Sequence, residues 1–262
     1  MNKMLSLMNT NIFVEHPSHN VVIIKLNRPE KRNALNISLL QDFLSTLKST
    51  EKDPSKRVLI LQGEGPVFCA GMDLAEACDT SKSIESSEIL AQVFSALYHT
   101  PLITIAAVHG AAIAGGAGLV TACDLALASE NTFFGYPETR RGLVAAQVMV
   151  FLMRQLKQKD LKELLLTGEL IDAKKAQVIG LINQVVPQEK LLFEALKMAN
   201  SVINGAPEAT QETKQLIQKL YPSKFEEDLL LALSNHQQRR RSKEAQEGMQ
   251  AFLEKRNPQW EI

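Results

Sequence analysis

The chain has 262 residues, enough for one large domain or for a domain with a small appendage. Lys plus Arg and Asp plus Glu number 29 each, so the formal net charge is zero, which argues against a nucleic-acid or membrane-surface partner selected by bulk charge. Hydrophobic residues make up 45% and charged residues 22%, the composition of an ordinary globular protein.

The first half of the chain alternates between strand patterns and helix patterns. A β-branched run at 21–26 ends at the turn signal Asn27-Arg28-Pro29. Asn36 can then cap a helix whose apolar residues recur at helical spacing. In chain order, this half predicts strands at 21–26, 58–61, 102–108 and 125–128, and helices from 37 to about 47, at 86–99 and at 117–122.

Helical patterns dominate after a polar loop predicted at 133–142. They cover 145–157, 160–167, 172–179 and 188–204, with one strand at 181–186 between them, and the chain from Pro207 looks wholly helical. Strand–helix alternation followed by helices predicts an α/β core with a helical C-terminal part. We place the boundary between residues 1–205 and 206–262.

Three cysteines, Cys69, Cys78 and Cys123, form no CxxC pair. An odd number without close pairing predicts free thiols in a reducing compartment and gives no zinc site. Met1–Thr10 has no apolar core long enough for a signal sequence, and no run approaches the roughly 18 apolar residues of a membrane span. We therefore expect a cytoplasmic protein without a membrane partner.

The glycine-rich stretch Val108–Asp124 lies between a predicted strand and a predicted short helix. It lacks the Gly-Lys-Ser/Thr ending of a P-loop and does not complete the dinucleotide fingerprint GxGxxG. A second small-residue turn occurs at Ala70-Gly71. One exposed amide from each turn could hold an oxyanion, although the glycines could instead serve only close packing.

Glu138 is the best candidate for a base. It lies in a loop bounded by apolar segments, where burial would raise its basicity toward working pH. The alternative is a loop carboxylate paired with Arg140 or Arg141. Asp73 and Asp124 look like capping or local pairing groups. The five histidines have no ligand spacing, and His109, beside the glycines, is only a possible neighbour of the site.

Several segments, in order and with few length changes, resemble the crotonase superfamily, which includes the enoyl-CoA hydratase/isomerase family. The resemblance covers nearly the whole chain. Its segments are Leu26-Asn27-Arg28-Pro29 with Lys31 and Asn33-Ala34-Leu35-Asn36, Phe68–Leu74, Ala114-Gly115-Gly116, Phe134-Gly135 with Pro137-Glu138, Leu166-Thr167-Gly168, Asp172-Ala173 with Ala176, Gly180-Leu181-Ile182, and Glu247-Gly248-Met249 with Ala251-Phe252 and Glu254-Lys255-Arg256.

The resemblance implies an α/β superhelix of repeated ββα units, with a helical C-terminal region that builds homotrimers, often stacked as homohexamers. It implies an acyl-coenzyme A thioester as substrate, and no metal or redox cofactor. The amides of Met72 and Gly115 would hold the thioester oxygen, and Glu138 would move protons. By the same resemblance, substrate or coenzyme A would be bound by Lys31, Asn33, Ala34, Leu35, Ala70, Gly71, Asp73, Leu74, Gly116, Phe252 and Lys255.

Gly118 departs from the pattern of the best-known hydratases in this family, which carry a second glutamate there. Adding water across a double bond needs a base for the water and an acid for the α-carbon. Moving a double bond from the 3,4 to the 2,3 position needs only one base, as in the family's Δ3,Δ2-enoyl-CoA isomerases. Hydration and isomerisation both stay open, and the alternative of another class is a catalytically weak acyl-CoA-binding or structural protein.

Overall fold

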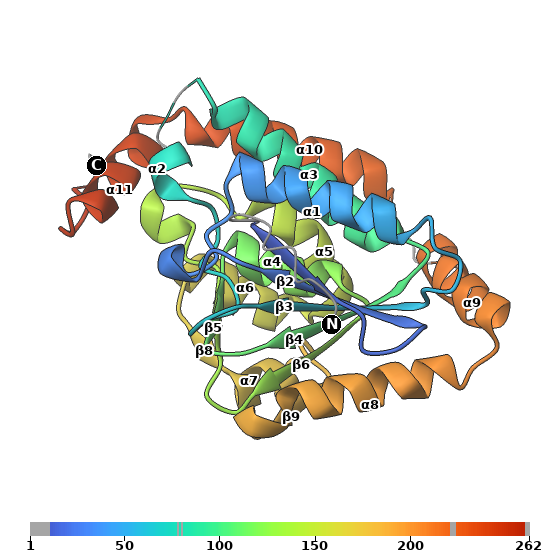
Figure 1. The fold of residues 1–262 in the computed structure, drawn as a ribbon. Coiled ribbons are helices and arrows are strands. Elements are labelled where there is room, and N and C mark those ends of the chain that lie inside the picture. The colour runs from blue at the N-terminus through green and yellow to red at the C-terminus, as the bar shows by residue number, and fades with distance from the viewer. Residues whose placement is uncertain (1–10, 78, 80, 221–223, 260–262) are drawn as a thin grey trace, which may run out of the picture.

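The computed structural model describes residues 11–77, 79, 81–220 and 224–259, so the predictions for Met1–Thr10 and Cys78 lie outside the described residues. The main sheet has the order β1-β2-β3-β4-β6-β9 (Figure 1). Its strands are β1 (Ile12–Glu15), β2 (Val21–Leu26), β3 (Val58–Gly63), β4 (Ile103–Val108), β6 (Leu125–Ser129) and β9 (Gln184–Val186). Only β1 is antiparallel to its neighbour; the other pairs are parallel.

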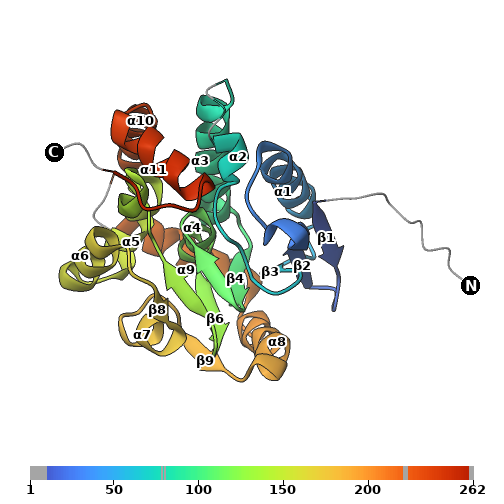
Figure 2. The same ribbon diagram turned by 90° about the vertical axis from the view of Figure 1, so that its left-hand side faces the viewer.

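Both faces of this sheet are covered by helices, so its central strands are apolar throughout. The strands β2 and β4 consist mainly of buried Val, Ile and Ala, and successive side chains enter different cores. Figures 1 and 2 show α8 on one face and α1, α3 and α4 on the other. These helices are α1 (Ile37–Thr50), α3 (Ser83–His99), α4 (Gly115–Ala122) and α8 (Leu191–Ile203).

A second sheet, of three short strands, lies beside the glycine-rich stretch. It consists of β5 (Ala111–Ile113), β7 (Phe133–Gly135) and β8 (Ile171–Asp172) in the order β5-β7-β8. The prediction of a loop at 133–142 is therefore wrong for its first three residues, which form β7 and pair in parallel with β5. Strands of two or three residues are too short for a periodic pattern to reveal.

The predicted helical second half is confirmed, with shifted boundaries. The α4 helix begins at Gly115 rather than Ala117, and the strand predicted at 181–186 is only β9. The helices of this half are α5 (Ala146–Gln155), α6 (Gln158–Thr167), α7 (Ala173–Val178), α8, α9 (Pro207–Leu220), α10 (Phe225–Arg240) and α11 (Lys243–Leu253). Among the described residues, no helix is long and apolar enough to cross a bilayer.

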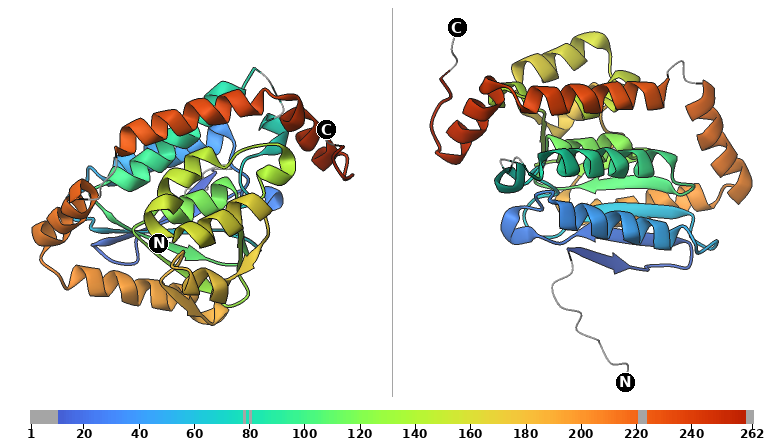
Figure 3. Two further views of the ribbon diagram at one scale, coloured as in Figure 1. Left: turned by 180° about the vertical axis from the view of Figure 1, so that it is seen from behind. Right: turned by 90° about the horizontal axis from the view of Figure 1, so that it is seen from above.

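The C-terminal helices return to the core instead of standing apart from it. The α10 helix packs against α3 and α5, as the view from above in Figure 3 shows for α3. Lys214 of α9 is buried, and its Nζ donates to the Leu102 carbonyl and to Asp124 Oδ2, both at 2.8 Å. Asp124 also accepts from the amide and hydroxyl of Thr104, so it is a pairing group as predicted, but its partners are distant in the sequence. The boundary at 205/206 stays a prediction.

Replacing Lys214 by methionine should loosen α9. The change keeps most of the buried chain but removes the charge that faces Asp124 and the donor to Leu102. We expect the free energy of unfolding to fall by roughly 2–4 kcal/mol, as is typical when one partner of a buried ion pair is removed. Urea denaturation measures this. The control is Lys224→Met, whose exposed pair with Glu227 should contribute little; equal losses for the two variants would contradict the expectation.

Candidate active site

Two backbone turns bring the amides of Met72 and Gly115 close together. A β-carbon built on Gly71 would lie 3.5 Å from the Gly115 nitrogen, and one built on Gly115 would lie 3.9 Å from Met72 Cγ. Gly71 has φ = 90°, a conformation that favours glycine. The first turn is held to Leu35, whose amide donates to Gly71 O at 2.7 Å and whose carbonyl accepts from Asp73 at 2.9 Å.

Because Gly71 O and Asp73 N both face Leu35, the amide of Met72 between them points to the opposite side of the chain, away from Leu35. Gly115 is the first residue of α4, so its amide has no acceptor within the helix. Within the described part of the chain, neither Met72 N nor Gly115 N donates a hydrogen bond to another protein group. Two such donors, one of them at the positive end of a helix, are suited to bind a developing oxyanion.

Cys69 joins the two turns through its backbone. Its amide donates to Ala111 O at 3.1 Å, and its carbonyl accepts from Ile113 at 3.0 Å. Gly116 packs directly against this residue. Burial raises the pKa of the Cys69 thiol to about 12, so the thiol stays protonated and does not act as a nucleophile at neutral pH. Cys69 therefore has a structural role beside the two amides.

Glu138 is buried and lies in the loop after β7. Its Oε2 has no hydrogen-bond partner among the described residues. Burial raises its pKa from 4.5 to about 7, and the charge of Arg141 only partly opposes this. Arg140 pairs instead with Glu169 at 2.7 Å, and the Arg141 guanidinium lies 4.4 Å from the centre of the Phe252 ring. The structure describes no ion pair between Glu138 and either arginine, so the alternative of a paired loop carboxylate loses its support.

The C-terminal end of the chain holds this loop. A 3₁₀ turn, η2 (Thr139–Arg141), follows Glu138 and packs against α11. Gly248 of α11 lies so close that a β-carbon there would be 2.4 Å from the carbonyl of Arg141. Arg239 of α10 donates through Nε to Gly142 O at 2.9 Å. The position of Glu138 thus depends on α10 and α11.

One cavity of about 640 Å³ unites these groups. Eight of the residues predicted for the site line it: Lys31, Ala34, Ala70, Met72, Asp73, Gly115, Glu138 and Phe252. A cavity of similar volume, about 660 Å³, lies between α9 and the core and contains none of the predicted residues. The chemistry belongs to the first of these cavities.

Five other predicted site residues lie around the cavity without lining it: Asn33, Leu35, Gly71, Gly116 and Lys255. Asn33 is fully buried, and its Nδ2 donates to the carbonyls of Glu64, Val67 and Phe68 at 2.8–3.1 Å. Leu35 and Gly71 hold the Met72 turn, Gly116 contacts Cys69, and Lys255 is exposed after α11. Leu74 begins the helix α2 (Leu74–Ala77). Asp73 pairs with Arg28 at 3.1 Å and caps Ala75, as its predicted local role requires.

His109 is half-buried, its Nε2 lies 2.9 Å from Gly65 O, and it does not line the cavity. Sequence reasoning did not predict as site residues six polar or charged residues that line the cavity: Arg32, Arg140, Arg141, Gln147, His236 and Arg256. The only available signal for Gln147 was a polar residue within the apolar pattern of its predicted helix. No sequence pattern pointed to His236, because α10 reaches the cavity only by packing against α3 and α5, which are distant in the sequence.

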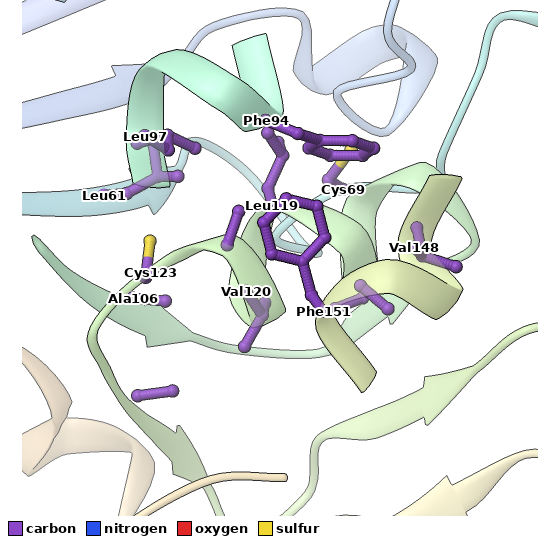
Figure 4. Packing of buried hydrophobic residues seen from close by; sticks show 14 of the residues in the cluster. Leu61, Cys69, Phe94, Leu97, Ala106, Leu119, Val120, Cys123, Val148 and Phe151 are labelled. Atoms are coloured by element: carbon purple, nitrogen blue, oxygen red, sulfur yellow. The ribbon is translucent and has the colours of Figure 1, made fainter. Parts of the chain in front are cut away.

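Gly118 is covered by apolar side chains. A β-carbon there would lie 2.5 Å from Phe94 Cζ and 2.5 Å from Val148 Cγ1. Figure 4 shows Phe94 and Phe151 over the helix that carries Leu119 and Val120; the two rings are 5.7 Å apart and nearly perpendicular. The place of a second glutamate is thus filled by hydrocarbon. Among the described residues, no group of three or more His, Cys, Asp or Glu side chains could hold a metal ion.

Comparison with known proteins identifies the family and the fold. A sequence model of the enoyl-CoA hydratase/isomerase family matches residues 16–262. A putative enoyl-CoA hydratase of Thermus thermophilus is 38% identical over 245 residues, covering 92% of this chain and 97% of the relative. An enoyl-CoA hydratase from Mycobacterium avium superposes with a TM-score of 0.87 at 32% identity, covering 97% and 100% of the two chains. A putative enoyl-CoA hydratase/isomerase (crotonase) from Legionella pneumophila superposes with a TM-score of 0.76 at 34% identity, covering 96% and 99%. The predicted crotonase-like fold is confirmed.

Glu138→Gln should stabilise the protein in a pH-dependent way. A carboxyl whose pKa is about 7 when folded and near 4.5 when unfolded holds its proton more tightly in the native state. The tighter binding of this proton contributes fully to the free energy of unfolding below pH 4.5, and the contribution is lost as pH rises through 7. At pH 8 the variant should unfold with a free energy about 2–3 kcal/mol above the wild type. Urea denaturation across this pH range measures the difference; a gain independent of pH would contradict it.

Gly118→Ala should destabilise the protein, because its methyl group would collide with Phe94 and Val148. Overpacking of this kind costs roughly 1–3 kcal/mol, more than the gain of about 1 kcal/mol from alanine in a helix. Gly115→Ala is the control, since its nearest contact is an ordinary 3.4 Å. Thermal unfolding compares the two variants, and equal midpoints would refute the steric argument.

Proposed function

The chain belongs to the enoyl-CoA hydratase/isomerase family, and from this membership we propose that it processes acyl-coenzyme A thioesters through an enolate. The observation that carries the proposal is the buried carboxyl of Glu138, which lines one cavity together with Met72 and Gly115. Its Oε2 has no hydrogen-bond partner among the described residues. Coenzyme A enters as part of the substrate.

The thioester oxygen would accept hydrogen bonds from the amides of Met72 and Gly115. As a proton leaves C2, negative charge moves to this oxygen, and the fixed donors stabilise it without reorganisation. Glu138 takes or returns the proton. With a pKa of about 7, this carboxyl is accessible as base and as acid near neutral pH.

The surroundings of Glu138 favour double-bond isomerisation as the net reaction. Isomerisation needs one base that removes a proton at C2 and returns it at C4. Asp73, the other carboxylate that lines the described cavity, is engaged by Arg28. Phe94 and Val148 close off Gly118, so no second acid stands there.

Hydration of a 2-enoyl-CoA is the second candidate. It is favoured by the similar proteins from Thermus thermophilus and Mycobacterium avium, which are named as enoyl-CoA hydratases. In this reaction Glu138 would have to activate the water and protonate the α-carbon in turn, or share these tasks with another group.

The coenzyme A part would lie along residues 31–35 and 70–74. Lys31 and Arg32 line the cavity and offer positive charge to phosphates. Phe252 and Lys255 would reach the nucleotide end. We further propose a homotrimer or homohexamer, supported by exposed apolar side chains on α9 and α10: Leu216, Ile217, Leu220, Leu230 and Leu231.

The test offers the purified protein crotonyl-CoA and a 3-enoyl-CoA side by side. Loss of the absorbance of the conjugated thioester identifies hydration, and its appearance identifies isomerisation. Glu138→Gln should lower kcat by about 10²–10⁴ while acyl-CoA binding persists, because only proton transfer is removed.

Glu169→Gln is the matched control, since this exposed carboxylate pairs with Arg140 nearby and should be dispensable. A wild type that binds acyl-CoA but turns over no enoyl-CoA thioester, plain or substituted, would contradict the proposal of an enzyme and leave an acyl-CoA-binding protein. Retained activity in Glu138→Gln would instead refute the role of Glu138.

A further inference from the structure

Gln147 is a buried polar residue in the wall of the cavity, and one of its polar atoms has no hydrogen-bond partner among the described residues. It is only 3% exposed and lies on α5. Its Nε2 donates to the Ser87 carbonyl of α3 at 3.0 Å, while its Oε1 has no hydrogen-bond partner among the described residues. Because a carbonyl can only accept, the amide nitrogen must face Ser87. The unpaired group of this cavity-lining residue is therefore an acceptor.

The next polar residue of this wall is also an acceptor. His236 of α10 lines the cavity, and its ring interacts with the backbone of Val144. Burial, followed by the charge of Arg240, lowers its pKa to about 4, so the ring is neutral at pH 7. A neutral imidazole has one donor and one acceptor, and the Val144 carbonyl takes the donor.

Arg240 does not turn this wall into an anion site. Its Nη1 donates to Ser83 O at 3.0 Å and to the hydroxyls of Ser86 and Ser87 at 3.1 Å, within the seam between α3 and α10. It does not line the cavity. Among the arginines that do line the cavity, Arg140 and Arg256 pair with glutamates and Arg141 stacks on the Phe252 ring. Beside Gln147 and His236, a carboxylate on the acyl group would meet two acceptors, and a plain hydrocarbon chain would leave the Gln147 oxygen buried without a donor.

We propose that the acyl group of the substrate carries a hydroxyl that donates to Gln147 Oε1, so that the enzyme prefers hydroxylated acyl-CoA thioesters. This inference rests on the proposed function. A site built to hydrogen-bond a substrate hydroxyl rejects the analogue that lacks it, because a buried polar group is then unpaired. We expect kcat/KM for the hydroxylated substrate to be at least about tenfold higher.

The experiment compares three six-carbon enoyl-CoA thioesters on the wild-type enzyme: one with an unsubstituted chain, one hydroxylated at C5 and one hydroxylated at C6. In all three thioesters the double bond is at the position, 2,3 or 3,4, that the comparison of crotonyl-CoA with a 3-enoyl-CoA shows the enzyme to use. A preference for either hydroxylated thioester supports the inference. Equal or better turnover of the plain chain overturns it while leaving the proposed function intact, whereas turnover of none of the three, nor of the simple thioesters, refutes the proposed function itself.

Gln147→Leu should abolish the preference by lowering kcat/KM for the hydroxylated thioester and sparing the plain one. Gln155→Leu is the matched control: it lies on the same helix and donates to the Thr121 carbonyl at 2.8 Å, but it lines the other cavity. Equal losses on both substrates would show that Gln147 is only structural. Should the leucine variant fail to fold, the wild-type comparison still decides.

Discussion

The active site depends on the backbone pairing between two turns that are far apart in the sequence. Leu35 holds one turn from outside, and Cys69 bonds to the residues that lead into the other. These bonds use the neighbouring amides and leave those of Met72 and Gly115 free. Main-chain donors fixed in this way require few side chains, which explains how a methionine can occupy the first position.

The same apolar packing that shapes the cavity determines the state of Glu138. A buried carboxyl with one unpartnered oxygen among the described residues keeps its proton up to about pH 7, at a cost in folding free energy once it ionises. The apolar cover of Gly118 extends this environment to the side where a second acid would stand. Apolar packing therefore accounts both for the raised pKa of Glu138 and for the lack of room for a second carboxylate at Gly118.

Long elements and backbone turns could be predicted from the sequence, because their signals are local. The run at Val21–Leu26, the cap at Asn36 and the glycines around Gly115 each have a periodicity or a turn chemistry of their own. The short strands β5 and β7 have none. Nor could sequence show that Asn33 serves three carbonyls, or that Gln147 and His236 face one cavity, since these facts arise from packing between distant elements. The resemblance suggested roles that spacing alone did not.

The close approach of α11 to the loop after Glu138 concerns the order in which the molecule is completed. During synthesis the two amides and Glu138 are made well before Gly248. The loop has its contact with α11 and its bond from Arg239 only after the last helices have docked. A nascent or truncated chain can thus hold the whole set of reactive groups without the arrangement that makes them work together. The proposed site is therefore completed at the end of folding, not when its last reactive group has been translated.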